Sequence, residues 1–124
     1  MYMNDYQTAA RRTAMGNSLD HFVHGLTEEA GEVAGVMKRF HRGDEKYKER
    51  LIGYDPVPLK QYVKWSLSTY AKDKLMAEIG DVLWYIAMIA DELEITLEEV
   101  AKYNIDKLAD RAARKAIKGE GDNR

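Results

Sequence analysis

The sequence predicts an all-α protein, most simply a four-helix bundle with an extra loop or short helix between its second and third helices. Both prolines, Pro56 and Pro58, fall in one short stretch, so few helix breakers interrupt the rest of the chain. Apolar residues outside that stretch recur at helical spacing, and no β-type alternation persists. The length of 124 residues suits one domain, residues 1–124.

The ends of the helices follow from capping and glycine signals. Ser18 or Asp20 can cap a second helix that ends at Gly43, and the run Thr96-Leu97-Glu98-Glu99 is a capping box that starts a fourth. Between the second and third helices lies an irregular, aromatic-rich stretch, residues 44–70, in which residues 59–68 can form a short helix. We expect helices over residues 5–15, 19–42, 71–93 and 97–117, followed by a frayed tail over residues 118–124.

Composition excludes several classes of protein. The chain has no cysteine, so it has no disulfides, zinc–thiolate sites or cysteine nucleophiles. The formal net charge of −2 disfavours general binding to nucleic acids or anionic membranes, which requires a basic surface. No secretory signal is recognisable at the N-terminus and no apolar run is long enough to span a bilayer, so we expect a cytoplasmic location.

The predicted second helix has a carboxylate on its apolar face. At about 100° per residue, Glu29 falls among the apolar residues, with Glu32 at the edge of this face and Glu28 further round. Burying an ionised carboxylate is very unfavourable without a compensating cation or donors. A solvated charged face is the usual meaning of Glu-x-x-Glu, but the central position of Glu29 favours a functional role. The apolar face comprises Phe22, Leu26, Val33, Val36 and Phe40.

The predicted third helix repeats this arrangement with Glu78 and Asp81. Each pair is spaced i, i+3, which puts both carboxylates on one helix face, so the four converge if the helices pack antiparallel. Oxygen ligands without cysteine or histidine suit Mg²⁺ or Mn²⁺. No histidine has a glutamate three residues before it, which argues against a di-iron carboxylate site. The inner stripe of this helix is expected to comprise Leu75, Ile79, Val82, Ile86 and Leu93.

A second apolar surface on the third helix predicts a partner subunit. Residues 82–90 are apolar nearly all the way round, so this part of the helix must be covered on more than one side. In a chain of this size, a second copy of the protein is the simplest element that could cover that side. We therefore expect a homo-oligomer.

The predicted fourth helix supplies the opposite charge. Asn104, Lys107 and Arg111 lie at i, i+3 and i+7, so one face carries an amide and two cations. Taken alone, a salt-bridge network is the commoner meaning of such a face. Together with the four carboxylates, a metal–phosphate site is the better account, because arginine suits bidentate contact with phosphate. The apolar stripe of this helix is expected to comprise Leu97, Val100, Ala101, Ile105, Leu108 and Ala112.

Three runs of the sequence resemble the MazG-like nucleoside triphosphate pyrophosphohydrolases. These enzymes belong to the all-α NTP pyrophosphatase superfamily, together with the dimeric dUTPases. Their signature is a Glu-x-x-Glu pair on one helix and a Glu-x-x-Asp pair on the next, and Glu29-Ala-Gly-Glu32 and Glu78-Ile-Gly-Asp81 occupy those places. The resembling runs are residues 25–33, residues 78–85, and residues 104–108 with Arg111.

The resemblance implies a reaction and a role for each residue. Members cleave between the α- and β-phosphates, giving a monophosphate and pyrophosphate, work as homodimers or homotetramers, and here would serve in housecleaning of the nucleotide pool. By resemblance, Mg²⁺ is ligated by Glu29, Glu32, Glu78 and Asp81, Glu28 is a further ligand or orients the attacking water, and the triphosphate or sugar is contacted by Asn104, Lys107 and Arg111. As the catalytic residue that accepts the proton of this water, we expect Glu28 or Glu32.

Two other functions stay open from the sequence. One is a non-catalytic helical dimerisation or regulatory module, in which the charges form salt bridges. The other is a dUTPase-like or phosphoribosyl-nucleotide pyrophosphohydrolase on the same scaffold. The stretch between Glu32 and Glu78 is longer than the family pattern, and a lid, a base-recognition element and an oligomer contact are its three candidate roles. Trp65 and Trp84 are candidates for stacking on a base.

Overall fold

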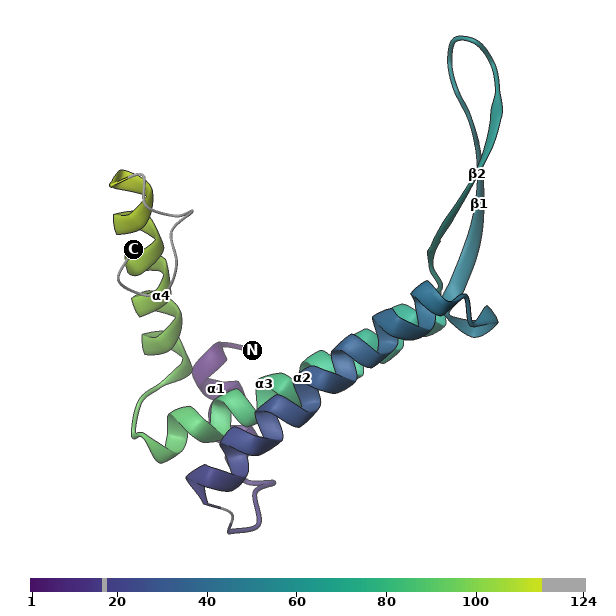
Figure 1. Ribbon diagram of the computed structural model, residues 1–124. Helices are drawn as coiled ribbons and strands as arrows, with labels where there is room; N and C mark the ends of the chain where they lie inside the picture. Colours follow the sequence, from purple (N-terminus) through teal and green to yellow (C-terminus); the bar gives the residue numbers. More distant parts are fainter. Residues whose placement is uncertain (17, 115–124) are drawn as a thin grey trace. The chain divides into compact units, whose positions relative to one another are not determined.

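The computed structural model describes residues 1–16 and 18–114 (Figure 1). Two compact units can be distinguished: unit 1 is built from residues 1–22 and from residue 86 onward, and unit 2 from residues 23–85. None of the described helices is long and apolar enough to cross a membrane. In chain order the elements are α1 (Met3–Arg11), α2 (Leu19–Arg42), the 3₁₀ helix η1 (Glu45–Tyr47), β1 (Lys48–Tyr54), β2 (Gln61–Leu67), α3 (Thr69–Glu92) and α4 (Leu97–Ala113).

The predicted all-α class with four helices is confirmed. Helix α2 has the predicted bounds, and Gly43, at φ 87°, ends it. Helix α1 begins and ends earlier than the predicted residues 5–15. The predicted extension of the fourth helix to Ile117 and the tail over residues 118–124 lie outside the described residues.

In unit 1, polar side chains of α1 hold the start of α4. Both groups of the buried Gln7 amide are used, since Nε2 donates to the Ile95 carbonyl at 2.9 Å and Oε1 accepts from the Leu97 amide at 2.8 Å. The Asn4 side chain also forms two bonds: its Nδ2 donates to the Glu98 carboxylate, and its Oδ1 accepts from the Glu98 backbone amide. The predicted capping box of α4 is confirmed, with the Thr96 hydroxyl accepting from the Glu99 amide at 3.0 Å.

Gln7 therefore offers a test of this junction. Gln7→Leu leaves the Leu97 amide and the Ile95 carbonyl without these bonds, and an unsatisfied buried polar group costs about 1–3 kcal/mol. We expect the free energy of unfolding, measured by denaturant titration, to fall by about that amount. Thr8→Ala on the same helix is the control: the Thr8 side chain is exposed and bonds only to the Asn4 carbonyl of its own helix, so a change within about 0.5 kcal/mol is expected.

In unit 2, α2 and α3 lie side by side and run antiparallel (Figure 1). Two contacts show that the helices are antiparallel. Gly25 of α2 lies against the ring of Tyr85 of α3. Glu29, one turn after Gly25 on α2, lies near Asp81, which is one turn before Tyr85 on α3. The Ser68 hydroxyl accepts from the Ala71 amide at 3.1 Å and caps the start of α3. This pairing brings the two predicted carboxylate motifs together.

The connection between α2 and α3 is a β-hairpin, so the short helix predicted over residues 59–68 is wrong. Strands β1 and β2 pair antiparallel, with Ile52 opposite Val63 and Arg50 opposite Trp65. The β-branched and aromatic content of β2 favours a strand over a helix. Both prolines lie in the turn between the strands, where no ladder hydrogen bond is lost.

The predicted apolar stripes are only partly buried. On α2, Phe22 and Val36 are buried as expected. On α3, Ile79 is 54% exposed, and Leu93, which was predicted for this helix, lies just beyond its end and is 53% exposed. On α4, Leu97 alone of the predicted stripe is buried. An apolar stripe identifies the face of a helix that is stabilised by burial, but it does not identify the element that packs against this face.

Candidate metal centre

Three carboxylates from two helices converge in unit 2. Glu29 on α2 and Glu78 and Asp81 on α3 each offer an oxygen atom, and these oxygens lie within 4.8 Å of one another. Glu29 and Glu78 are half-buried, and Asp81 is exposed. We refer to these three residues as the carboxylate trio. The i, i+3 spacing on α3 puts its two members on one face, and the antiparallel packing of α2 brings the third to them.

The electrostatics of the trio favour a cation. Partial desolvation raises the pKa of Glu29 above its ordinary value, and the negative charges of Asp81, Glu78, Glu28 and Glu32 raise it further. Every charged group that shifts this pKa is another carboxylate. Such a cluster of like charges is unfavourable on its own, and a cation bound among the carboxylates would relieve their repulsion.

The sequence of this chain is similar to those of several known proteins. Residues 17–114 match the sequence model of the MazG nucleotide pyrophosphohydrolase domain. The chain belongs to this family. It is similar to the Gene 37 protein of Mycobacterium phage L5, at 33% identity over the whole of both chains. It is also similar to the uncharacterized protein YvdC of Bacillus subtilis, at 33% identity over 69% of this chain and 68% of that one. No solved structure is significantly similar to it.

The carboxylate trio of this MazG domain fits a hard divalent cation. All three residues supply carboxylate oxygens, which Mg²⁺ and Mn²⁺ prefer over nitrogen or sulfur ligands. The repulsion that raises the pKa of Glu29 is what such a cation would offset. The residues present are therefore suited to the metal that the family resemblance implies.

Two further predicted site residues border the trio without belonging to it. Glu28 and Glu32 are exposed on α2 and lie near enough to raise the pKa of Glu29, but neither is part of the group that spans 4.8 Å. They are accessible to water beside the trio. Metal ligation by Glu32 and a catalytic role for either residue stay predictions.

The three predicted substrate-binding residues lie on α4, in unit 1. Asn104 is exposed, Lys107 is half-buried with its ammonium 6.0 Å from the centre of the Tyr103 ring, and Arg111 is buried at 4% exposure. The trio lies in unit 2, so the structure does not bring these residues and the trio into one described unit. Their contact with the triphosphate stays a prediction.

A basic groove on α2 was missed by the sequence analysis. It has a volume of about 270 Å³ and begins at Glu32, next to the trio. Its floor contains both glycines of the α2 centre, and its far end is basic. A helical projection of the sequence contains this signal, because the residues recur at spacings of three and four on one side of the helix. The groove is lined by Gly31, Glu32, Gly35, Lys38, Arg39 and Arg42.

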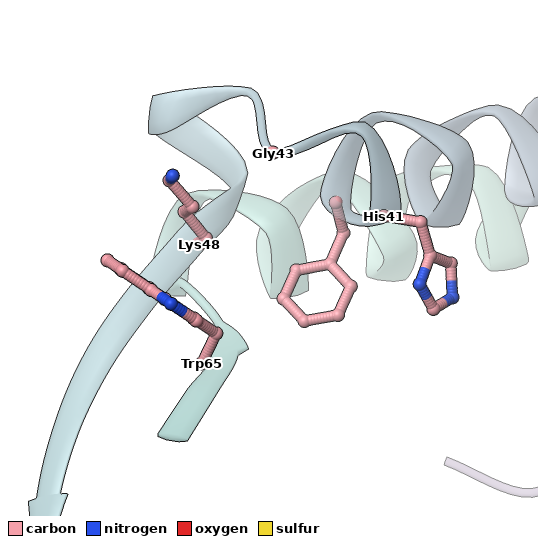
Figure 2. Close-up of a pocket in the computed structure, with 5 residues that line it drawn as sticks. His41, Gly43, Lys48 and Trp65 are labelled. Carbon is pink, nitrogen blue, oxygen red and sulfur yellow. The ribbon is translucent and has the colours of Figure 1, made fainter. Parts of the chain in front are cut away.

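A second pocket, of about 320 Å³, lies where α2 meets the hairpin (Figure 2). Phe40, His41 and Gly43 line it from the α2 side, and Lys48 and Trp65 from the two strands. The Lys48 ammonium is 4.5 Å from the centre of the Trp65 ring, which is a cation–π contact. Phe40 lies eleven residues beyond Glu29, which is roughly 16 Å along the helix, so this pocket is separate from the trio.

Proposed function

We propose that this MazG domain hydrolyses nucleoside or deoxynucleoside triphosphates to the monophosphate and pyrophosphate, with Mg²⁺ as cofactor and Mn²⁺ as a substitute. The observation that carries the proposal is the carboxylate trio: three oxygen donors from two antiparallel helices, surrounded by further carboxylates. Membership of the family supports the reaction class, and the trio supports a site for the reaction in unit 2. Housecleaning of a cytoplasmic nucleotide pool is the role we propose for the reaction.

Each residue of the site has a role in this proposal. Glu29, Glu78 and Asp81 would hold the metal, which when bound supplies Lewis-acid stabilisation of phosphate charge. Glu28 or Glu32, exposed beside the trio, would accept the proton of the water that attacks the α-phosphorus. The bond from that phosphorus to the bridging oxygen breaks, and negative charge develops on the leaving pyrophosphate. Cations near the trio would stabilise this charge.

The test is incubation of the purified protein with a panel of NTPs and dNTPs, with Mg²⁺ or with EDTA, followed by anion-exchange separation of the products. A monophosphate and pyrophosphate that form only with the metal are the expected result. Turnover restricted to deoxyuridine nucleotides would indicate a dUTPase-like enzyme instead. No turnover of any nucleotide with Mg²⁺ or Mn²⁺ would overturn the proposal and favour a non-catalytic dimerisation module.

We also propose that the protein acts as a homodimer or homotetramer. Val36 and Ala71 are the two hydrophobic side chains that unit 2 buries, whereas one face of the hairpin exposes Ile52 at 54%, Tyr54 at 60% and Trp65 at 49%. An isolated two-stranded hairpin is marginally stable in water, so a second copy that covers this face would stabilise it. Light scattering coupled to size-exclusion chromatography is expected to give a mass of two or four chains; a single-chain mass at micromolar concentration would contradict this.

A further inference from the structure

The basic groove on α2 contains two cationic side chains, Lys38 and Arg39, that have no role in the proposed reaction. Among the described residues, neither Lys38 nor Arg39 forms an ion pair or a hydrogen bond. Arg42, in contrast, is bound to Asp44 through two bonds of 2.8 and 2.5 Å, which hold the pKa of Asp44 below its ordinary value. The groove therefore offers one exposed ammonium and one half-buried guanidinium to a ligand.

The guanidinium of Arg39 lies along the surface of α2. It folds back over Gly35, so that a β-carbon built there would lie 3.1 Å from Nη1. Its central carbon lies 5.9 Å from the centre of the Tyr47 ring, at the edge of cation–π distance. Side chains on a helix lean toward its N-terminus, which brings this charge back toward Glu32.

The distance from the trio suits a phosphate chain. Gly35 lies six residues beyond Glu29, the member of the carboxylate trio on α2, which is roughly 9 Å along the helix axis. A cation at the level of Gly35 is therefore about 1.7 helical turns from the trio along this axis. The floor between them is Gly31 and Gly35, and nothing lies within 4 Å of the position of a β-carbon at Gly31. A ligand can thus lie close to the helix along this path.

We propose that Arg39, assisted by Lys38, binds the β- and γ-phosphates of the substrate and neutralises the pyrophosphate as it leaves. The inference rests on the proposed function, and it names the part of the substrate that this groove takes. A planar guanidinium matches two phosphate oxygens at once, and Lys38 adds a mobile point charge. With the metal site at one end and Arg39 at the other, α2 alone would span the phosphate chain. The nucleoside would lie outside the groove.

The proposal separates ligands that carry the terminal phosphates from those that do not. Arg39→Gln is expected to raise the KM for the triphosphate and to weaken inhibition by inorganic pyrophosphate with Mg²⁺ by about 10- to 100-fold, the size of a lost charge-assisted contact. Inhibition by the nucleoside monophosphate, which lacks those phosphates, is expected to change less than about threefold. Arg39→Lys keeps the positive charge but loses the planar guanidinium that can contact two phosphate oxygens. Its KM and its inhibition by pyrophosphate should lie between those of Arg39→Gln and the wild type.

The matched control is Lys64→Gln, which removes an exposed cation from β2 of the same unit. It is expected to behave as the wild type in all three measurements. Equal weakening of pyrophosphate and monophosphate by Arg39→Gln would indicate a general structural effect and overturn the proposal, as would unchanged pyrophosphate inhibition.

Direct binding distinguishes a failure of the groove from a failure of the proposed function. Calorimetric titration of the wild type and Arg39→Gln with inorganic pyrophosphate and Mg²⁺ needs no turnover. If the wild type hydrolyses triphosphates but both proteins bind pyrophosphate equally, the groove assignment is wrong and the function stands. If the wild type binds pyrophosphate through Arg39 but hydrolyses no nucleotide, the groove assignment stands and the proposed function is wrong.

Discussion

Glu29→Gln is expected to lower the turnover of the best triphosphate by at least about 10³-fold, equivalent to about 4 kcal/mol in activation free energy. The substitution removes the α2 member of the carboxylate trio and keeps the shape of the side chain. A hard cation held by two carboxylates in place of three would bind more weakly and be positioned less well, so less of its stabilisation of phosphate charge would reach the reaction. The measurement is the steady-state rate of pyrophosphate release at saturating Mg²⁺.

The same substitution is expected to lower activity without lowering the stability of the metal-free protein. In the absence of metal, Glu29→Gln is expected to be at least as stable as the wild type, because it removes a charge repelled by Asp81 and Glu78. The wild type should gain stability from Mg²⁺, about 2.7 kcal/mol at a concentration 100 times the dissociation constant, and the variant should gain little. Thermal melts with and without Mg²⁺ measure both effects.

Glu49→Gln is the matched control for these experiments. Glu49 is an exposed carboxylate on β1 and is not part of the trio. Its replacement is expected to leave turnover and the stabilisation by Mg²⁺ unchanged. Wild-type turnover by Glu29→Gln, with a normal helical circular dichroism spectrum, would show that the trio is not the metal site.

The carboxylate trio could be predicted because helical periodicity and a simple antiparallel pairing of two helices are enough to bring it together. The spacing of Glu29 within an apolar stripe, and of Glu78 and Asp81 on the next helix, fixes which faces they occupy. Antiparallel packing of α2 and α3 then brings the three oxygens together. The proposed role of Arg39 could not be derived in this way, because it depends on a side-chain rotamer that folds back over Gly35.

The hairpin was missed because its strands are exposed on both faces. A strand that buries one face alternates polar and apolar residues, but β1 reads Lys-Glu-Arg-Leu-Ile-Gly-Tyr, with no such period. The alternation Val63-Lys64-Trp65-Ser66-Leu67 in β2, the β-branched and aromatic composition of β2 and the prolines of the turn were the remaining signals. The register also pairs Gly53 with Tyr62, whose ring covers the glycine backbone, and this pairing requires knowledge of the partner strand.

The exposed apolar residues of α3 and α4 show a second limit of sequence reasoning. Ile79 and Ile105 lie on predicted inner stripes, yet they are 54% and 64% exposed. Periodicity shows which face of a helix is the most hydrophobic, but that face is buried only if another element packs against it. The most hydrophobic face can be found from the local sequence, whereas the element that packs against it depends on long-range contacts.

Gly25→Ala is expected to destabilise the protein, although alanine favours a helix by about 1 kcal/mol over glycine. A β-carbon at Gly25 would lie well inside contact distance of the Tyr85 ring, so the ring or the helix has to move. Overpacking of this kind costs about 1–3 kcal/mol, which exceeds the gain in helix propensity. We expect a net loss of about 1–2 kcal/mol in the free energy of unfolding, measured by denaturant titration.

Gly80→Ala on α3 is the control that isolates this contact. Nothing lies within 4 Å of the position of its β-carbon, so the gain in helix propensity is unopposed and a stabilisation of up to about 1 kcal/mol is expected. Stabilisation by both substitutions would contradict the close packing of Gly25 against Tyr85. A double-mutant cycle with Tyr85→Leu should show coupling, because the smaller side chain leaves room for the new methyl group.

The same contact lies beside the candidate metal centre. Gly25 lies one turn before Glu29 on α2, and Tyr85 lies one turn after Asp81 on α3, so their contact fixes how closely the two helices approach beside the trio. Gly25→Ala is therefore expected to weaken stabilisation by Mg²⁺ as well as folding, although it removes no ligand. Tyr85→Leu should restore part of both in the double variant. Restored stability without restored response to Mg²⁺ would separate the packing of the helices from the position of the carboxylates.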